Sequence, residues 1–259
     1  MSHGTTQSLG APVLELRDLH LAYGQTQVVR GFSLQVDAAE CLALIGPNGA
    51  GKSSLFNLIS GQVKPDRGEV FLQGQRIDGL RPFEVNRRGL ARSFQVSQLF
   101  WRLSVEDNLR CAVLCRLGHG LAFWKRLASA RGVRDETEHW MGSLGLVPRR
   151  DVPASALSYA EQRALELGLA LAGGAGVVLL DEPTAGMSRT ETTHFVALIR
   201  QLTRGKTLLI VEHDMGVVFE LADRIAVMVR GELLVCATPP LVRADPRVQQ
   251  AYLGQALPC

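Results

Sequence analysis

One segment constrains the fold of this chain more than any other: Gly46-Pro47-Asn48-Gly49-Ala50-Gly51-Lys52-Ser53-Ser54. It fits the pattern G-x-x-x-x-G-K-[ST]. Ahead of it, residues 41–45 form an apolar block typical of a buried parallel strand. Behind it, residues 55–59 place apolar side chains where a helix would bury them. Because strand, loop and helix follow in the required order, the segment predicts a phosphate-binding loop.

The residue types explain how such a loop holds phosphate. Glycines let backbone N–H groups curl around phosphate oxygens, and the following helix directs its dipole and free amides at the same anion. Lys52 supplies a positive charge for the β- and γ-phosphates, and the Ser53 hydroxyl is suited to ligate Mg²⁺. The sequence therefore predicts that the protein binds a nucleoside triphosphate.

Composition and length narrow the class of protein. The chain has 259 residues and a formal net charge of +3, too small to indicate nucleic-acid binding by itself. The N-terminus lacks the basic start and apolar core of a signal peptide. The longest uncharged stretch, residues 167–180, has about 14 residues, too few to span a bilayer. We expect a chain that does not cross a membrane alone.

The cysteines show no disulfide-like framework, which favours a reducing cytosol. Cys111, Cys115 and His119 follow an i, i+4, i+8 spacing along one helical face. A zinc site would need a fourth ligand and tighter pairing, so we expect a buried helix face there instead.

The rest of the chain predicts an α/β core that contains a helical insertion. Alternating residues at 13–21 and 28–36 predict an antiparallel β layer before the loop strand. Residues 104–156 lack alternation and have helix-like spacing. Capping-box pairs at Ser158/Glu161 and Ser188/Glu191 predict two helix starts. Further strands are expected at 69–72, 177–181, 208–211, 225–229 and 233–235, with short helices over 239–254.

Polar residues at strand ends complete the predicted site. Asp181-Glu182 follows a buried strand, as a P-loop ATPase requires: the aspartate holds Mg²⁺ and the glutamate polarises the attacking water. His213 ends another parallel-type strand and is placed to hydrogen-bond a γ-phosphate, although strand-end histidines are usually structural. Tyr23 either stacks on an adenine face or packs near a turn.

Together, these segments resemble the ATP-binding subunits of ABC transporters across nearly the whole chain. The loop at 46–54 is similar to Walker A, residues 177–182 to Walker B, Gln95 to the Q-loop glutamine and His213 to the switch histidine. Tyr23 resembles the adenine-stacking aromatic, and residues 157–162 resemble the ABC signature.

The resemblance implies specific roles for these residues. It implies ATP and Mg²⁺ as cofactors, and an α/β fold with a P-loop NTPase (RecA-like) core, an antiparallel β layer and an inserted α-helical subdomain. The implied division is 12–95 and 159–259 for the core, with 96–158 for the helical subdomain. The implied catalytic residues are Lys52, Glu182 and His213; the metal-binding residues are Ser53, Gln95 and Asp181; and the signature contacts to nucleotide are Ser158, Ala160 and Glu161.

Within the family, the chain is most similar to ATPases of branched-chain amino acid importers. The supporting features are Ala91-Arg92-Ser93-Phe94-Gln95, the Ser-Tyr-x-Glu-Gln signature, Glu212-His213-Asp214-Met215 and Ala251-Tyr252-Leu253-Gly254. The alternatives are an ATPase for lipid, lipopolysaccharide or another small solute such as urea or an amide, and a soluble ABC protein acting on DNA or ribosomes. The last class usually carries two cassettes or a long coiled-coil insertion, and this sequence shows neither.

The resemblance also implies partners and a location. It implies a second ATPase subunit (identical or different), transmembrane permease subunits and, indirectly, an extracytoplasmic solute-binding protein. Nucleic acid is not expected. The implied location is peripheral, at the cytoplasmic face of the plasma (inner) membrane.

Three residues depart from the family pattern. Ala160 replaces the signature glycine, Leu169 replaces an arginine, and Ser188 replaces Asp or Asn in the D-loop. If position 160 requires a positive φ, alanine costs about 1–2 kcal/mol. We hypothesise a heterodimer with one strong and one weakened ATP site, and an ordinary two-site ATPase is the alternative.

Overall fold

The computed structural model of the chain describes residues 11–93, 99–117 and 131–251. Its contacts divide it into two compact units, one formed by residues 1–90 with 205–259 and the other by residues 91–204. The predicted division into 12–95, 96–158 and 159–259 has different boundaries and stays a prediction.

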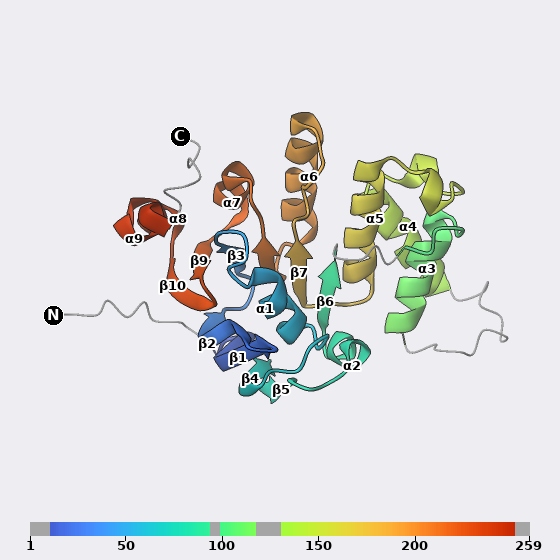
Figure 1. The fold of residues 1–259 in the computed structure, drawn as a ribbon. Coiled ribbons are helices and arrows are strands. Elements are labelled where there is room, and N and C mark those ends of the chain that lie inside the picture. The colour runs from blue at the N-terminus through green and yellow to red at the C-terminus, as the bar shows by residue number, and fades with distance from the viewer. Residues whose placement is uncertain (1–10, 94–98, 118–130, 252–259) are drawn as a thin grey trace. The chain divides into compact units, whose positions relative to one another are not determined.

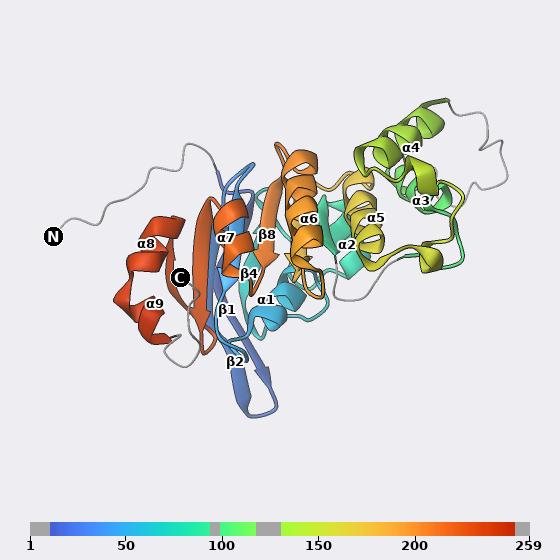
Figure 2. The same ribbon diagram turned by 90° about the horizontal axis from the view of Figure 1, so that it is seen from above.

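The first unit contains an antiparallel layer. Alternate residues of its first strand are buried, as the sequence predicts, because one face of the layer packs inward. Its strand order is β2-β1-β4-β5, and Figure 2 shows β1 and β2 as a long hairpin. Leu14 pairs with Val36 on one side and with Leu72 on the other. The strands are β1 (Leu14–Tyr23), β2 (Thr26–Val36), β4 (Arg67–Leu72) and β5 (Gln75–Arg76).

The first unit also contains parallel strands. β3 (Cys41–Ile45) pairs in parallel with β8 (Thr207–Val211) and with β9 (Arg224–Val229). β10 (Glu232–Ala237) runs antiparallel to β9. Residues 42–45 are all buried, which explains why the strand is an unbroken apolar run. The helices are α1 (Lys52–Ile59), α2 (Pro82–Arg87), α7 (Met215–Leu221), α8 (Pro239–Ala244) and α9 (Pro246–Ala251).

The second unit is mainly helical. In Figure 1, α3, α4 and α5 lie close together, and α3 contacts both of the others. Val113, Val133 and Ala172 join these helices in one buried cluster. The strands are β6 (Leu90–Ser93), which begins at the unit boundary, and β7 (Val177–Asp181). The helices are α3 (Val105–Arg116), α4 (Arg131–Ser143), α5 (Tyr159–Ala172) and α6 (Arg189–Leu202), with 3₁₀ turns at Val147–Arg149 and Ala154–Ala156.

The predicted strands and the helical character of the described part of the insertion are confirmed, but four strands and helices were not predicted. β5, β6, α2 and α7 are each too short to show a clear period. The expected buried face at the cysteines is wrong for Cys115, which is exposed, whereas Cys111 is half-buried. His119 lies outside the described residues.

The described residues offer neither a ready metal-binding cluster nor a helix suited to span a membrane. No described group of histidine, cysteine and acidic side chains is arranged to hold a metal ion. Of the described helices, none is long and apolar enough to cross a membrane.

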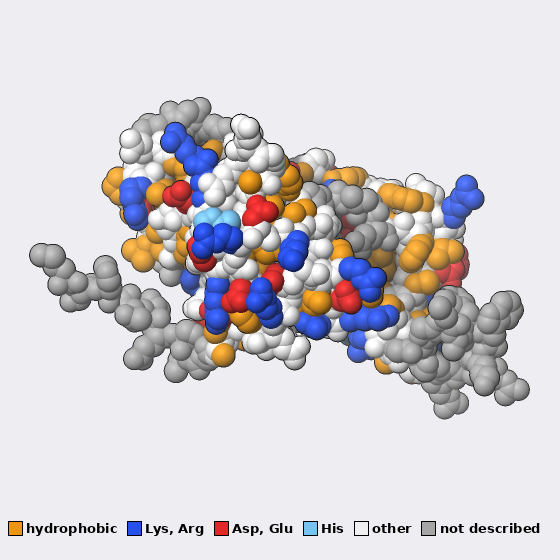
Figure 3. All heavy atoms as spheres, turned by 60° about the horizontal axis from the view of Figure 1, so that its bottom comes forward, with side chains coloured by type: hydrophobic (Ala, Val, Ile, Leu, Met, Phe, Trp, Pro, Cys, Tyr) orange, Lys and Arg blue, Asp and Glu red, His pale blue; other side chains and the backbone are white. Residues whose placement is uncertain are grey.

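The surface mixes charges of both signs. Figure 3 shows basic and acidic side chains side by side on one face. Ion pairs such as Arg17–Glu15 (2.7 Å) and Arg76–Glu69 (2.6 Å) are of this kind. Because exposed pairs contribute roughly 0–1 kcal/mol, the fold does not depend on them.

A stability prediction follows from the cap of α6. The Ser188 hydroxyl accepts a hydrogen bond from the Glu191 amide, and the Glu191 carboxylate accepts one from the Ser188 amide. We expect Ser188→Ala to lower the free energy of unfolding by about 1 kcal/mol in urea titrations near neutral pH. Thr193→Ala, an exposed change inside the same helix, is the control and should not destabilise the protein.

The loss should depend on pH. Hydrogen bonds from the side chain and backbone of Ser188 hold the pKa of Glu191 below its ordinary value of 4.5. A lowered carboxyl pKa stabilises the folded state above the ordinary pKa, and this contribution disappears as pH falls through the folded-state value. The difference between wild type and Ser188→Ala should therefore shrink in that acid range. A difference that does not change with pH would contradict the capping box.

Candidate functional site

The predicted phosphate loop connects β3 to α1 in the first unit. Gly49 and Gly51 have φ values of 78° and 105°, which favour glycine. A Cβ on Gly51 would lie 2.7 Å from the Val28 carbonyl oxygen, and one on Gly46 would lie 2.1 Å from that of Met228. The loop backbone therefore lies directly against the neighbouring strands, and only glycine fits at these two contacts.

A turn between β9 and β10 ties the loop to β2. The Gly231 amide donates to the Ala50 carbonyl (2.9 Å), and the Arg30 amide donates to the Gly231 carbonyl (2.9 Å). Sequence reasoning missed Gly231. The only signal was a glycine between two predicted strands, which does not reveal what the turn contacts.

The start of α1 fits an anionic ligand. Its N-cap, Gly51, has no side-chain capping bond, and its first turn contains no acidic residue. The first-turn amides and the helix dipole therefore face no anionic or capping side chain from the helix itself. Lys52 is buried, and its Nζ donates to the carbonyl oxygens of Gly46 (2.7 Å) and Pro47 (3.1 Å). This set of donors fits a polyphosphate, and the Ser53 hydroxyl is on an exposed residue beside it.

Two other predicted site residues belong to the first unit. Tyr23 ends β1 and is 50% exposed, so it does not pack as a buried turn residue. His213 follows β8 and is exposed, and its amide donates to the buried Glu212 carboxylate (3.0 Å). Asp214 caps α7 through the Gly216 amide (2.7 Å). These contacts fix the backbone on both sides of His213.

The predicted acidic pair lies at the end of β7 in the second unit. Asp181 is buried, and its Oδ2 accepts a hydrogen bond from Nη2 of Arg92 on β6 (2.7 Å). Glu182 has a φ of 49°, a conformation that costs energy for any residue other than glycine. Such strain is found at functional sites more often than elsewhere. The sequence analysis assigned no function to Arg92, which it named only as part of the segment 91–95.

The predicted signature begins α5. Ser158 caps the helix by accepting from the Glu161 amide (3.3 Å), while the Ser158 amide donates to the Glu161 carboxylate (2.8 Å). Ala160 lies in the first turn and is not among the residues with positive φ. The backbone strain expected if residue 160 had a positive φ is therefore absent, because alanine fits a helical backbone.

A tyrosine links the signature to the segment after β7. The Tyr159 hydroxyl donates to the Ala185 carbonyl (3.0 Å) and accepts from Nε (2.9 Å) and Nη2 (2.6 Å) of Arg163. The ring edge also lies close to Gly186. This network fixes the start of α5 relative to the loop that follows Glu182.

One predicted site residue, Gln95, lies outside the described residues.

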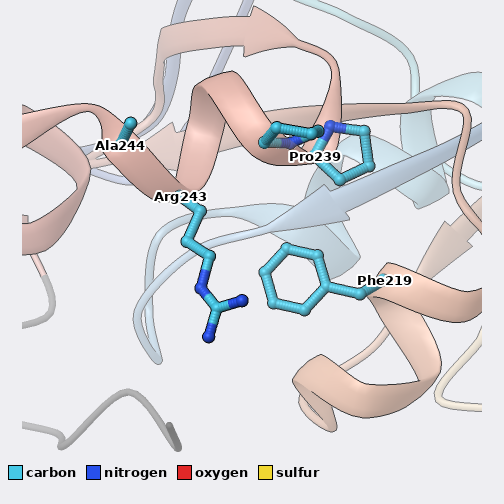
Figure 4. A pocket seen from close by; sticks show the side chains of 5 residues that line it. Phe219, Pro239, Arg243 and Ala244 are labelled. Carbon is cyan, nitrogen blue, oxygen red and sulfur yellow. The ribbon is translucent and has the colours of Figure 1, made fainter.

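A hollow of about 410 Å³ elsewhere in the first unit is lined by Phe219, Pro239, Pro240, Arg243 and Ala244 (Figure 4). The Arg243 guanidinium lies 5.6 Å from the Phe219 ring centroid. None of the predicted site residues lines this hollow.

Comparison with known proteins decides the family. The profile of the ABC transporter family matches residues 29–185. The chain belongs to the ABC transporter family. It is 34% identical to the high-affinity branched-chain amino acid transport ATP-binding protein BraF of Pseudomonas aeruginosa, over 96% of this chain and all of the relative.

Two further similarities support this assignment. The lipopolysaccharide export system ATP-binding protein LptB of Acidithiobacillus ferridurans is 34% identical over 93% of this chain and 97% of its own. The crystal structure of an ATP-binding cassette of an ABC transporter in its ADP conformation is 26% identical, with a TM-score of 0.80 over 95% of this chain and all of the other. The chain is an ABC ATPase with the ABC ATPase fold, and it binds ATP.

The loop geometry makes a prediction for this ABC ATPase. Gly51→Ala should lower the free energy of unfolding by more than about 2 kcal/mol, because it adds both the cost of a positive φ and the contact with Val28. Gly49→Ala is the matched control, since a Cβ there meets nothing within 4 Å. Gly49→Ala should lower the free energy of unfolding only by the cost of a positive φ, about 1–2 kcal/mol. Urea titration measures both, and equal losses would show that the Val28 contact is unimportant.

Proposed function

We propose that this ABC ATPase couples ATP hydrolysis to membrane import of branched-chain or related amino acids. The observation that carries the proposal is the end-to-end similarity to BraF, together with the signature form and the segment 91–95. Lipopolysaccharide or lipid export is the second candidate, favoured by the similarity to LptB.

The proposed roles of the residues follow from their chemistry. Lys52 and the loop amides bind the phosphates, and Tyr23 supports the adenine. Glu182 accepts the proton of the attacking water, and His213 hydrogen-bonds the γ-phosphate. Ser158, Ala160 and Glu161 form the surface offered to the nucleotide of a second subunit.

The proposed metal is Mg²⁺. This hard cation takes oxygen ligands, and Ser53, Asp181 and Gln95 offer a hydroxyl, a carboxylate and an amide oxygen. The Asp181 carboxylate is buried at a strand end, where oxygen ligands for a hard cation are commonly placed. When bound, the metal would neutralise charge on the phosphate oxygens.

The proposed assembly contains two ATPase subunits and transmembrane permeases. An extracytoplasmic solute-binding protein delivers the transported solute to the permeases and so works with this chain only indirectly. ATPase subunits of this family work with permease components. We place this chain at the cytoplasmic face of the plasma membrane, held there by those permeases.

A transport assay tests the proposal. The tagged chain is used to recover the complex from detergent-solubilised membranes, and the complex is placed in proteoliposomes. One sample receives labelled leucine together with the solute-binding protein of the complex, and a second sample receives labelled lipopolysaccharide. We expect ATP-dependent leucine uptake. Movement of lipopolysaccharide instead would move the assignment to export, and recovery of ribosomal or DNA-repair proteins would contradict transport altogether.

The same complex tests the role of Glu182. Glu182→Gln should lower ATP turnover by about 10²–10⁴-fold, because the base that accepts the proton is lost. Binding of a fluorescent ATP analogue should remain, since the phosphate-loop residues are unchanged. Glu232→Gln, on an exposed residue of β10, is the control and should keep turnover. Turnover that survives Glu182→Gln would assign the base elsewhere.

Residue 160 tests the proposed asymmetry between two ATP sites. Because the helical backbone accepts alanine without strain, any weakening must come from the added methyl group at the surface offered to the other subunit. Ala160→Gly should then raise turnover of the assembled complex several-fold. Unchanged turnover would favour an ordinary two-site ATPase.

A further inference from the structure

Arg92 and Asp181 form a buried ion pair for which the proposed function gives no reason. Their side chains are only 6% and 8% exposed, and Nη2 of Arg92 donates to Oδ2 of Asp181 at 2.7 Å. Arg92 belongs to β6 and Asp181 is the last residue of β7. The two residues are 89 positions apart, so the fold alone brings them together.

Stability alone does not explain why a charged pair, and not an apolar one, is buried here. Burying two charges costs desolvation energy that their attraction often fails to recover, and apolar pairs of similar size are commonly as stable or more so. β6 and β7 are also neighbours in the sheet order, so backbone hydrogen bonds already join them. A charged pair at this position therefore indicates a role for the charge itself.

The geometry indicates what that role is. The ion pair uses one carboxylate oxygen, Oδ2, and Oδ1 lies outside it. A planar guanidinium with a directed N–H bond restricts the rotation of the carboxylate it contacts. Carboxylates that ligate metals are themselves usually held by such outer hydrogen bonds.

We infer that Arg92 is a positioning residue that orients Asp181 for the divalent cation accompanying the nucleotide. Arg92 does not touch the cation; it fixes the carboxylate through Oδ2, so that the other oxygen is presented in one direction. This inference rests on the proposed role of Asp181. It also gives a function to an arginine that lies three positions before Gln95, another proposed metal-binding residue.

The test is the Mg²⁺ dependence of nucleotide binding by the full chain, which does not require hydrolysis. Binding of a fluorescent ADP analogue is measured in EDTA and then across a Mg²⁺ titration. For Arg92→Met, we expect binding in EDTA to match wild type and the half-saturating Mg²⁺ concentration to rise about 10–100-fold, the usual effect of losing an outer partner of a metal ligand. Arg92→Lys keeps the charge without the planar fork and should fall between the two.

Two matched variants complete the design. Arg224→Met removes a guanidinium that pairs with another buried carboxylate, Glu40 (3.1 Å), and should leave the Mg²⁺ dependence unchanged. Asp181→Asn reports on the metal ligand itself and should raise the half-saturating concentration at least as much as Arg92→Met.

The outcomes separate the inference from the proposed function. If Asp181→Asn shifts the Mg²⁺ dependence and a folded Arg92 variant does not, the pair is structural and the inference is overturned. A shift to lower Mg²⁺ concentration in Arg92→Met would also overturn it, because Arg92 would then compete with the cation. If Asp181→Asn has no effect, the proposed metal role of Asp181 fails first. Should circular dichroism show Arg92→Met unfolded, Arg92→Lys decides by the same criteria.

Discussion

The close approach of backbone to backbone at the phosphate loop is the constraint on which the first unit depends. Gly46 lies against the Met228 carbonyl, Gly51 against that of Val28, and Gly231 is hydrogen-bonded to Ala50. Each contact comes from a different strand or turn, so the shape of the loop depends on β2, β9 and the turn after β9. The loop holds its amides at the start of α1 without any capping side chain. An anion site made in this way is preorganised by packing, which reduces the entropy lost when a ligand binds.

The second unit meets a different constraint, the burial of charge at a strand end. Val177 to Asp181 is buried throughout, so the carboxylate at its end needs a partner inside the protein. Arg92 provides it. The adjacent Glu182 occupies a strained backbone conformation, and the network of Tyr159, Arg163 and Ala185 holds the loop that follows. The buried charge and the strained backbone both destabilise the unit, and they occur at the point where the proposed chemistry requires fixed acidic groups.

Much of the fold was predictable because local signals were strong. The apolar run at 41–45 marked β3, and the capping boxes at Ser158 and Ser188 marked the starts of α5 and α6. β6 was not predictable, since its four residues include a buried arginine and a buried serine that break any apolar pattern. The Arg92–Asp181 pair and the role of Gly231 depend on contacts between distant parts of the chain, which no local pattern contains. The roles assigned to the site residues stay predictions.

The signature departure at Ala160 shows how a structure changes the meaning of a substitution. The sequence predicted two effects of this substitution: backbone strain if residue 160 has a positive φ, and a weakened ATP site shared with a second subunit. Ala160 is helical, and Ser188, another departure, still caps its helix as Asp or Asn would. Both substitutions therefore leave the local fold intact. Any effect they have must act through the groups that this subunit presents to another subunit. At residue 160 a methyl group replaces the bare backbone of glycine. At residue 188 a hydroxyl replaces the carboxylate of Asp or the amide of Asn. Asymmetry between ATP sites, if the assembly has it, is then a property of recognition between subunits and costs this chain no folding energy.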